Sequence, residues 1–445
     1  MSVTKKSGFN LKKLALVICL LSVVAMGAAP SAQAQTRLIV RDSLGLPGLN
    51  LTCLVLGCNV VHGLGDPQGQ LFLITFPPIL NPVTALLRLQ LNLNLGIVDV
   101  ELDQSVDNSG NAYANSDSYL SDQAPTSYYG ATVWHGYVAQ PANQLVRTST
   151  TQSTFHVAGS GVTVAVIDTG VDPTNAVLKS VLVPGYDFTR NIAGGSEDND
   201  VSTTPNMSNA QAGQVNQRTV AVLDQRTVAV LDGQGYSDFG HGTMTAGIVH
   251  LVAPQAKIMP LKTFQANGTG YESDVLRAIY YAVANGATVM NMSFDFSSNS
   301  QELAAAVKYA NSKGVISVAS AGNDGQYAFV YPGALPSVIN VASTSNSDTQ
   351  STFTNYGAPP VFMAAPGEGV MTTYPWGTYA AGWGTSFSTP FVAGTAALMM
   401  GANGNCKAAS VSSGLSHATI IYNPELGWGR LDTYQAVASC HGLVL

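Results

Sequence analysis

Three short segments of this chain carry side chains that could together cleave an acyl bond. VAVIDTG contains Asp168, FGHGTM contains His241 and GTSFSTP contains Ser386. A serine becomes a nucleophile when a histidine accepts its proton and a buried carboxylate holds the imidazole in the required tautomer. The chain order Asp, His, Ser is one of the known orders of this triad. We therefore predict acyl transfer, with Asp168 orienting the base, His241 as general base and Ser386 as nucleophile.

Each of these residues also has an ordinary structural role. Asp168 could form a turn, His241 could cap a helix, and Ser386 could be an N-cap residue, a common position for serine. We favour catalysis because the three motifs occur in order, each where a predicted strand ends or a predicted helix begins.

Alternating strands and helices from residue 160 onward would position these groups. Apolar, β-branched runs predict buried strands at 162–168, 257–262, 288–294, 315–320 and 338–343. Apolar periodicity predicts one helix that Ser273 opens and Gly286 ends, and another from Ser300 to Gly314. This alternation predicts an α/β fold, a parallel sheet with helices on both faces, with the site at the carboxyl ends of the strands.

The sequence pattern of residues 37–106 predicts a separate, smaller α+β domain. Its strands are expected at 37–41, 59–66, 69–77 and 96–106, and its helices at 49–57 and 82–91. Asn81 and Pro82 are a capping residue and a first-turn proline, which favour the second helix. The order β-α-β-β-α-β is ferredoxin-like.

The first 34 residues have the pattern of a secretory signal: four lysines, a long apolar run, and Ala32-Gln33-Ala34. An uncleaved anchor helix is the alternative. We predict a secreted protein, extracellular or periplasmic, without a membrane span after cleavage. The predicted organisation is a signal peptide at 1–34, a small domain at 35–106, a polar linker with a processing site at 107–134, and a catalytic domain at 135–445.

The composition excludes two broad classes of protein. Of 445 residues, 46% are hydrophobic and 10% are charged, which argues against intrinsic disorder. Lys and Arg total 19 against 26 acidic residues, and beyond the first 13 residues there is no basic block, so we expect no nucleic-acid partner.

Four cysteines remain once Cys19 leaves with the signal, an even number that favours disulfides in an exported chain. They form two local couples, Cys53 with Cys58 and Cys406 with Cys440. The first couple would be too far apart inside one helix, unless Gly57 ends that helix. Metal ligation is the alternative, although zinc-type spacing is absent from the sequence around them.

The octapeptide QRTVAVLD occurs at 217–224 and again at 225–232. A single tandem copy does not make a repeat protein. We expect one copy to form a strand and the other to add a loop or hairpin.

The chain resembles the subtilisin-like serine proteases, the subtilases, over about residues 37–106 and 135–440. The resemblance lies in Asp168-Thr169-Gly170 and in Gly384-Thr385-Ser386-x-Ser388-x-Pro390. It implies a subtilisin-like three-layer fold preceded by an inhibitor-type propeptide. It also implies a monomeric secreted serine endopeptidase that acts on polypeptides and is made as a zymogen inhibited by its own propeptide. A catalytically silent binding scaffold on the same fold is the alternative hypothesis.

The resemblance also assigns roles to residues around the triad. It implies that Asn323 donates to the oxyanion. It further implies substrate-binding segments that comprise Gly268, Thr269, Gly270, Ser293, Phe294, Asp295, Ala321 and Gly322. An extended substrate would pair with the backbone edges of two of these segments.

The chain departs from the family pattern at three positions. Thr245 and Phe391 replace the usual apolar residue and the usual histidine, and both are expected to be packing changes that spare the triad. Asp295 stands where the family usually has glycine beside the specificity pocket, so we hypothesise altered selectivity with tolerance of basic residues.

Calcium is a candidate structural ion, whereas the chemistry itself requires no cofactor. The helix after His241 lacks the inserted loop of the family's strong calcium site. Glu197, Asp198 and Asp200 supply oxygen atoms in one loop and are the candidate ligands. A solvated acidic turn is the alternative.

Overall fold

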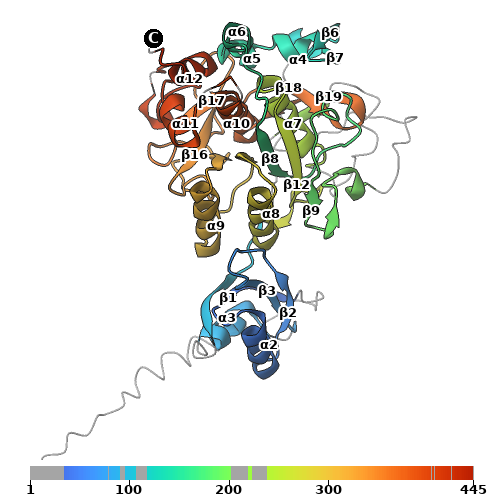
Figure 1. The fold of residues 1–445 in the computed structure, drawn as a ribbon, viewed down its shortest axis with the longest axis vertical. Helices are drawn as coiled ribbons and strands as arrows, with labels where there is room; N and C mark the ends of the chain where they lie inside the picture. Colours follow the sequence, from blue (N-terminus) through green and yellow to red (C-terminus); the bar gives the residue numbers. More distant parts are fainter. Residues whose placement is uncertain are drawn as a thin grey trace, which may run out of the picture.

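The computed structural model describes residues 35–78, 80–90, 96–106, 118–201, 219–222, 238–401, 403–404, 406–421 and 423–443. The predicted signal peptide, the segment 107–117 and the second copy of QRTVAVLD lie outside the described residues. The described part contains a small lobe and a large lobe (Figure 1). It contains no helix long and apolar enough to cross a membrane.

The small lobe has the predicted order of strands and helices. Its elements are β1 (Thr36–Asp42), α2 (Gly45–Leu56), β2 (Asn59–Gly63), β3 (Leu71–Phe76), α3 (Pro82–Gln90) and β4 (Ile97–Leu102). The strand order is β2-β3-β1-β4, and β1 is antiparallel to both neighbours. Helix α2 begins four residues earlier than predicted, and Gly57 ends it in the left-handed conformation. This ending brings the Cα atoms of Cys53 and Cys58 to 4.5 Å, and the two cysteines are bonded.

An eight-stranded sheet forms the centre of the large lobe. In spatial order its strands are β10 (Ile192–Ala193), β9 (Tyr186–Asp187), β12 (Lys257–Lys262), β8 (Thr163–Asp168), β14 (Val289–Met292), β15 (Ile316–Ser320), β16 (Val338–Thr344) and β17 (Met363–Pro366). The strands from β9 to β17 pair in parallel, and only β10 is antiparallel. Their carboxyl ends therefore meet along one edge of the sheet.

Helices cover both faces of this sheet. Helices α7 (His241–Val252) and α10 (Thr385–Met400) lie on one face, and α8 (Glu272–Ala284) and α9 (Gln301–Ser312) lie on the other (Figure 1). Successive side chains of β8 therefore point to opposite faces of the sheet. Val164 and Val166 pack with α7 and α10, whereas Ala165 and Ile167 pack with α8 and α9. The expected three-layer α/β architecture is confirmed.

The large lobe includes residues that we assigned to the linker. Residues 118–155, part of which we assigned to the linker, form η2 (Ser118–Ser121), β6 (Pro125–Tyr128), β7 (Ala131–Trp134), α4 (His135–Ala139), α5 (Pro141–Leu145) and α6 (Thr148–Phe155). Leu120, Tyr128 and Val133 are buried in the core of the large lobe. These apolar anchors are widely spaced within a polar sequence, so periodicity does not detect them.

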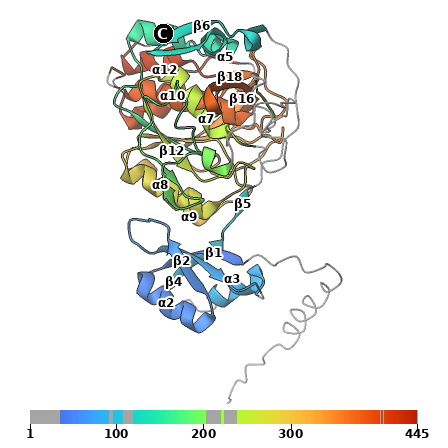
Figure 2. The same cartoon turned by 90° about the vertical axis from the view of Figure 1, so that its right-hand side faces the viewer.

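The remaining elements belong to the large lobe, except β5, which ends the small lobe at its junction with the large lobe (Figure 2). They are β5 (Ser105–Val106), β11 (Thr219–Val222), β13 (Gly270–Tyr271), β18 (Val370–Tyr374), β19 (Thr378–Trp383), η3 (Asp198–Asp200), η5 (Pro375–Gly377), η6 (Pro424–Leu426), α11 (Ala408–Leu415) and α12 (Thr433–Cys440). The first copy of QRTVAVLD supplies β11, which pairs with β19. Cys406 and Cys440 are bonded at a Cα distance of 5.0 Å. Figure 2 shows β5 at the junction between the two lobes.

Candidate active site

The three predicted catalytic residues lie where their elements meet the carboxyl edge of the sheet. Asp168 is the last residue of β8, His241 is the first residue of α7, and Ser386 lies in the first turn of α10. All three are buried. Gly240 and Gly384 precede the two helices with positive φ angles of 89° and 152°, backbone conformations that favour glycine.

Asp168 and His241 form a direct pair. His241 Nδ1 lies 2.6 Å from Asp168 Oδ1, which also accepts the backbone N–H of Thr169 at 2.7 Å. This pairing makes Nδ1 the protonated nitrogen, because a carboxylate can only accept. His241 Nε2 has no hydrogen-bond partner within the described part of the chain, so it can accept a proton.

Ser386 lies at the same edge of the sheet, where its hydroxyl donates to another group. Its Oγ donates to the carbonyl of Ser293 at 3.0 Å. The ring of His241 lies 5.6 Å from the ring of Phe387, the residue after the serine. Hydrogen bonds between nucleophile and base are often absent before substrate binds. The expected proton transfer therefore requires reorientation of the serine hydroxyl toward Nε2.

Asn323 is held next to Ser386 in one orientation. Its Oδ1 accepts the backbone N–H of Thr385 at 2.9 Å and the Thr385 hydroxyl at 3.0 Å. Because the oxygen is occupied, the amide NH₂ group points away from Thr385 and can donate. Backbone N–H groups in the first turn of α10 lack intrahelical acceptors and could donate as well.

The predicted substrate segments flank these groups. Thr263 to Gly270 forms a tight hairpin, in which Gln265 N–H donates to the Thr269 carbonyl at 2.8 Å and Gly268 has φ 77°. Gly270 already pairs with Val106 of the small lobe. Ser293, Phe294 and Asp295 follow β14, and Ala321 and Gly322 follow β15. All of these segments leave the same edge of the sheet.

Asp295 has an unusual electrostatic environment. Burial, together with the negative charge of Asp324, raises the pKa of Asp295 to about 6. The next residue, Phe296, exchanges two backbone hydrogen bonds with Tyr331. The Asp295 carboxylate is thus two residues along the chain from Ser293, whose carbonyl accepts the hydrogen bond of Ser386.

The structure gives Thr245 a role that sequence reasoning missed. We expected a packing residue, but its hydroxyl donates to Asp168 Oδ2 at 3.1 Å. Thr245 is one helical turn after His241, so its side chain lies on the same face of α7 as the histidine. The spacing between His241 and Thr245 could therefore have indicated this role from the sequence. Phe391, the other expected packing residue, is buried.

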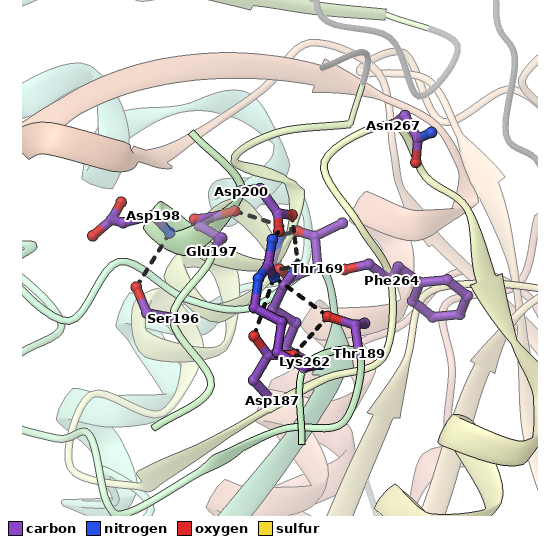
Figure 3. Close-up of polar contacts among 12 residues, drawn as sticks. Thr169, Asp187, Thr189, Ser196, Glu197, Asp198, Asp200, Lys262, Phe264 and Asn267 are labelled. Atoms are coloured by element: carbon purple, nitrogen blue, oxygen red, sulfur yellow. Dashed lines mark hydrogen bonds and ion pairs between the residues drawn. The ribbon is translucent and has the colours of Figure 1, made fainter. Parts of the chain in front are cut away.

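The candidate calcium ligands do not fit a calcium site. Glu197 accepts hydrogen bonds from Gly240 and Thr243, and Asp200 forms ion pairs with Lys262 and with an arginine (Figure 3). Within the described residues, no three His, Cys, Asp or Glu side chains form a group that could hold a metal. Two of the three candidates, Glu197 and Asp200, are bound by protein donors, whereas Asp198 Oδ1 has no hydrogen-bond partner within the described residues.

Comparisons with known sequences found a matching family model and several similar proteins. A sequence model of the subtilase family matches residues 159–434. Thermitase from Thermoactinomyces vulgaris is 34% identical over 292 residues, which cover 63% of this chain and 89% of thermitase. Subtilisin Savinase from Lederbergia lenta is 33% identical over 252 residues, which cover 55% of this chain and 77% of the relative. A thermophilic serine proteinase from a Bacillus species is 32% identical over 282 residues, 62% of each chain.

Proposed function

The chain belongs to the subtilase family and is a serine endopeptidase, and we propose that Asp168, His241 and Ser386 form its catalytic triad. The observation that carries this proposal is the buried Asp168–His241 contact of 2.6 Å, which leaves His241 Nε2 able to accept a proton. The membership in a family of proteases argues against the binding-scaffold alternative.

In the proposed mechanism Ser386 Oγ attacks the carbonyl carbon of the scissile peptide bond. His241 Nε2 takes the hydroxyl proton and then gives it to the leaving amine, while Asp168 stabilises the imidazolium. Water then attacks the carbonyl carbon of the acyl-enzyme, and His241 Nε2 takes a proton from that water. The histidine returns the proton to Ser386 Oγ as the carboxylic product leaves. These steps use protein groups alone and need no cofactor.

The Asn323 amide and the Ser386 backbone N–H are the proposed donors to the tetrahedral oxyanion. The amide is oriented in advance, since Thr385 occupies its oxygen through two hydrogen bonds. Donors fixed in this way stabilise negative charge without reorganisation during the reaction. Ala321 and Gly322 approach the site from the same loop as Asn323 and are proposed to contact the substrate backbone.

The test is hydrolysis of a denatured protein substrate by the purified wild type and by Ser386→Ala. We expect cleavage by the wild type alone. Persistent cleavage by the variant would overturn the assignment of the nucleophile.

We further propose that the chain is exported and that residues 35–106 act as an inhibitory propeptide. Three contacts between the lobes support the proposed inhibitory role of residues 35–106. The Arg41 guanidinium binds the Glu302 carboxylate at 2.8 and 2.5 Å, and Asp103 accepts the Ser273 backbone N–H at 2.9 Å. Strand β5 pairs with β13, on the edge where a substrate would add as a strand. Release would require cleavage between β5 and the large lobe.

Release of the propeptide is expected to depend on pH. Burial raises the pKa of Glu101 and of Asp274 to about 7, and burial plus the charge of Glu101 raises the pKa of Glu272 to about 8. Dissociation exposes these carboxylates and restores their ordinary low pKa values. The bound state therefore holds extra protons, and its affinity is highest at low pH and falls as pH rises through 7 to 8.

We expect the cleaved propeptide to bind about tenfold more weakly at pH 8 than at pH 6. This is the change expected if the complex loses one proton over part of this pH range. The measurement is the rate at which activity appears after cleavage, at pH 6, 7 and 8. Glu101→Gln should flatten this dependence. Equal rates at all three pH values in the wild type would contradict the prediction.

Asp295 is proposed to favour substrates with a basic side chain next to the scissile bond. The pKa of about 6 means that this carboxylate is charged above pH 6 and largely neutral below it. For Asp295→Gly we expect the ratio of kcat/KM for basic over apolar substrates to fall about tenfold at pH 8, or about 1.4 kcal/mol of differential binding. Matched peptides with Lys or Leu at that position would measure the ratio.

The selectivity difference should shrink at pH 5, where Asp295 is protonated in the wild type. Identical cleavage profiles for Asp295→Gly and the wild type at pH 8 would exclude a role for this residue in selectivity.

A further inference from the structure

A buried glutamate beside the active site contacts both segments that carry the Asp168–His241 pair. Glu197 immediately precedes η3 and is 0% exposed. The proposed chemistry does not use it, and the calcium hypothesis does not explain it. Its contacts therefore need another explanation.

Glu197 accepts hydrogen bonds from three donors on two different elements. Its Oε2 accepts the Gly240 backbone N–H at 2.8 Å and the Thr169 hydroxyl at 3.3 Å. Its other oxygen, Oε1, accepts the hydroxyl of Thr243. Thr169 directly follows Asp168, whereas Gly240 and Thr243 belong to the start of α7.

The two hydroxyl groups are oriented so that their protons face the glutamate. Thr169 Oγ1 accepts the Gly242 backbone N–H at 2.9 Å, and Thr243 Oγ1 accepts the Asp172 backbone N–H at 2.8 Å. Each hydroxyl therefore has its own proton available for Glu197. Both carboxyl oxygens face donors, so an amide in place of the carboxylate would turn an NH₂ group toward one of them.

The turn that carries Glu197 is anchored by a buried lysine. Lys262 Nζ donates to Asp200 and to the Thr169 carbonyl, both at 2.7 Å, and to the carbonyl of Phe264 (Figure 3). Lys262 is 0% exposed and neighbours Asp168 in the sheet. Thr169 is thus held on its carbonyl side by Lys262 and on its hydroxyl side by Glu197.

We propose that Glu197 is a positioning residue that fixes the end of β8 relative to the start of α7, and so fixes Asp168 relative to His241. A buried carboxylate is a costly way to gain stability alone, since apolar side chains fill such sites more favourably. Its benefit lies in directional bonds to both segments. The inference rests on the proposed triad. An error of about 1 Å between catalytic groups lowers rates by up to about 100-fold.

The experiment compares Glu197→Gln with Asp198→Asn, the same chemical change one residue along the turn. The Asp198 side chain is half-buried and points away from Glu197 and Lys262 (Figure 3). We expect Glu197→Gln to lower kcat about 10- to 100-fold with KM changed less than threefold, and Asp198→Asn to change kcat less than threefold. Rates are expressed per mole of mature, folded enzyme. Mass spectrometry verifies maturation, and circular dichroism verifies folding.

A second pair of variants protects the test against misfolding. Thr243→Val removes the hydroxyl that faces Glu197 at nearly constant volume, and Thr243→Ser retains it. We expect Thr243→Val to lower kcat at least fivefold and Thr243→Ser to restore it to within about twofold of the wild type.

A wild-type kcat in folded Glu197→Gln, or in folded Thr243→Val if the first variant does not fold, would overturn the proposal. A lower melting temperature with unchanged kcat would show a purely structural role and would also overturn it. Ser386→Ala tests the proposed function separately, because an active Ser386→Ala would refute the triad whatever the Glu197 variants do.

Discussion

Ser386→Ala is expected to lower kcat by about 10⁶-fold, because the variant lacks the atom that forms the acyl-enzyme. The residual rate would come from Asn323 and from substrate binding, which remain intact. KM should change little, since the one hydrogen bond that Ser386 Oγ makes within the described residues is to the Ser293 carbonyl. The measurement is steady-state hydrolysis of a chromogenic peptide.

Ser388→Ala is the matched control for this prediction. Ser388 is buried in the same helix, and its hydroxyl has no partner within the described residues. Its removal should leave kcat within about threefold. If the enzyme cuts its own propeptide, Ser386→Ala should also accumulate as the full precursor while Ser388→Ala matures. Equal loss of activity in both variants would indicate damage to α10 instead of loss of the nucleophile.

Asp168→Asn is expected to lower kcat about 10⁴-fold while the fold is retained. The Thr169 N–H and the Thr245 hydroxyl donate to the two oxygens of Asp168. Asparagine keeps one of these acceptors and presents an NH₂ group in place of the other. If that group faces His241 Nδ1, the imidazole holds its proton on Nε2 and cannot accept one from Ser386.

Thr245→Val is the control for the carboxylate. It removes one donor to Asp168 without removing the charge, so we expect less than a tenfold change in kcat. Circular dichroism should give the same spectrum for both variants. An Asp168→Asn variant with kcat within tenfold of the wild type would show that Asp168 does not orient the base.

The three-layer architecture could be predicted from the sequence, because buried parallel strands and capped helices leave strong local patterns. Strands β8, β12, β14, β15 and β16 appear within one or two residues of their expected bounds. Ser300 caps α9 as predicted and accepts the Leu303 N–H at 2.9 Å. Helix α8 begins at Glu272, one residue before the predicted start.

Contacts between distant segments could not be predicted in the same way. Glu197 and Asp200 are acidic residues in a loop, a pattern equally consistent with a metal site, a solvated turn or internal ion pairs. The outcome depends on Lys262, on Thr169 directly after β8 and on Thr243 of α7, which lie far away in the sequence. Likewise, the role of Thr245 depends on the distance between α7 and Asp168, which only the packed fold determines.

The measurement that tests the central claim most directly is the mapping of a covalent organophosphonate adduct on the mature enzyme. We expect one adduct per molecule, on the peptide that contains Ser386, with loss of activity in proportion to labelling. His241→Ala should react far more slowly, because its serine lacks a base. An adduct on a different residue, or peptide cleavage that survives complete labelling of Ser386, would contradict the account.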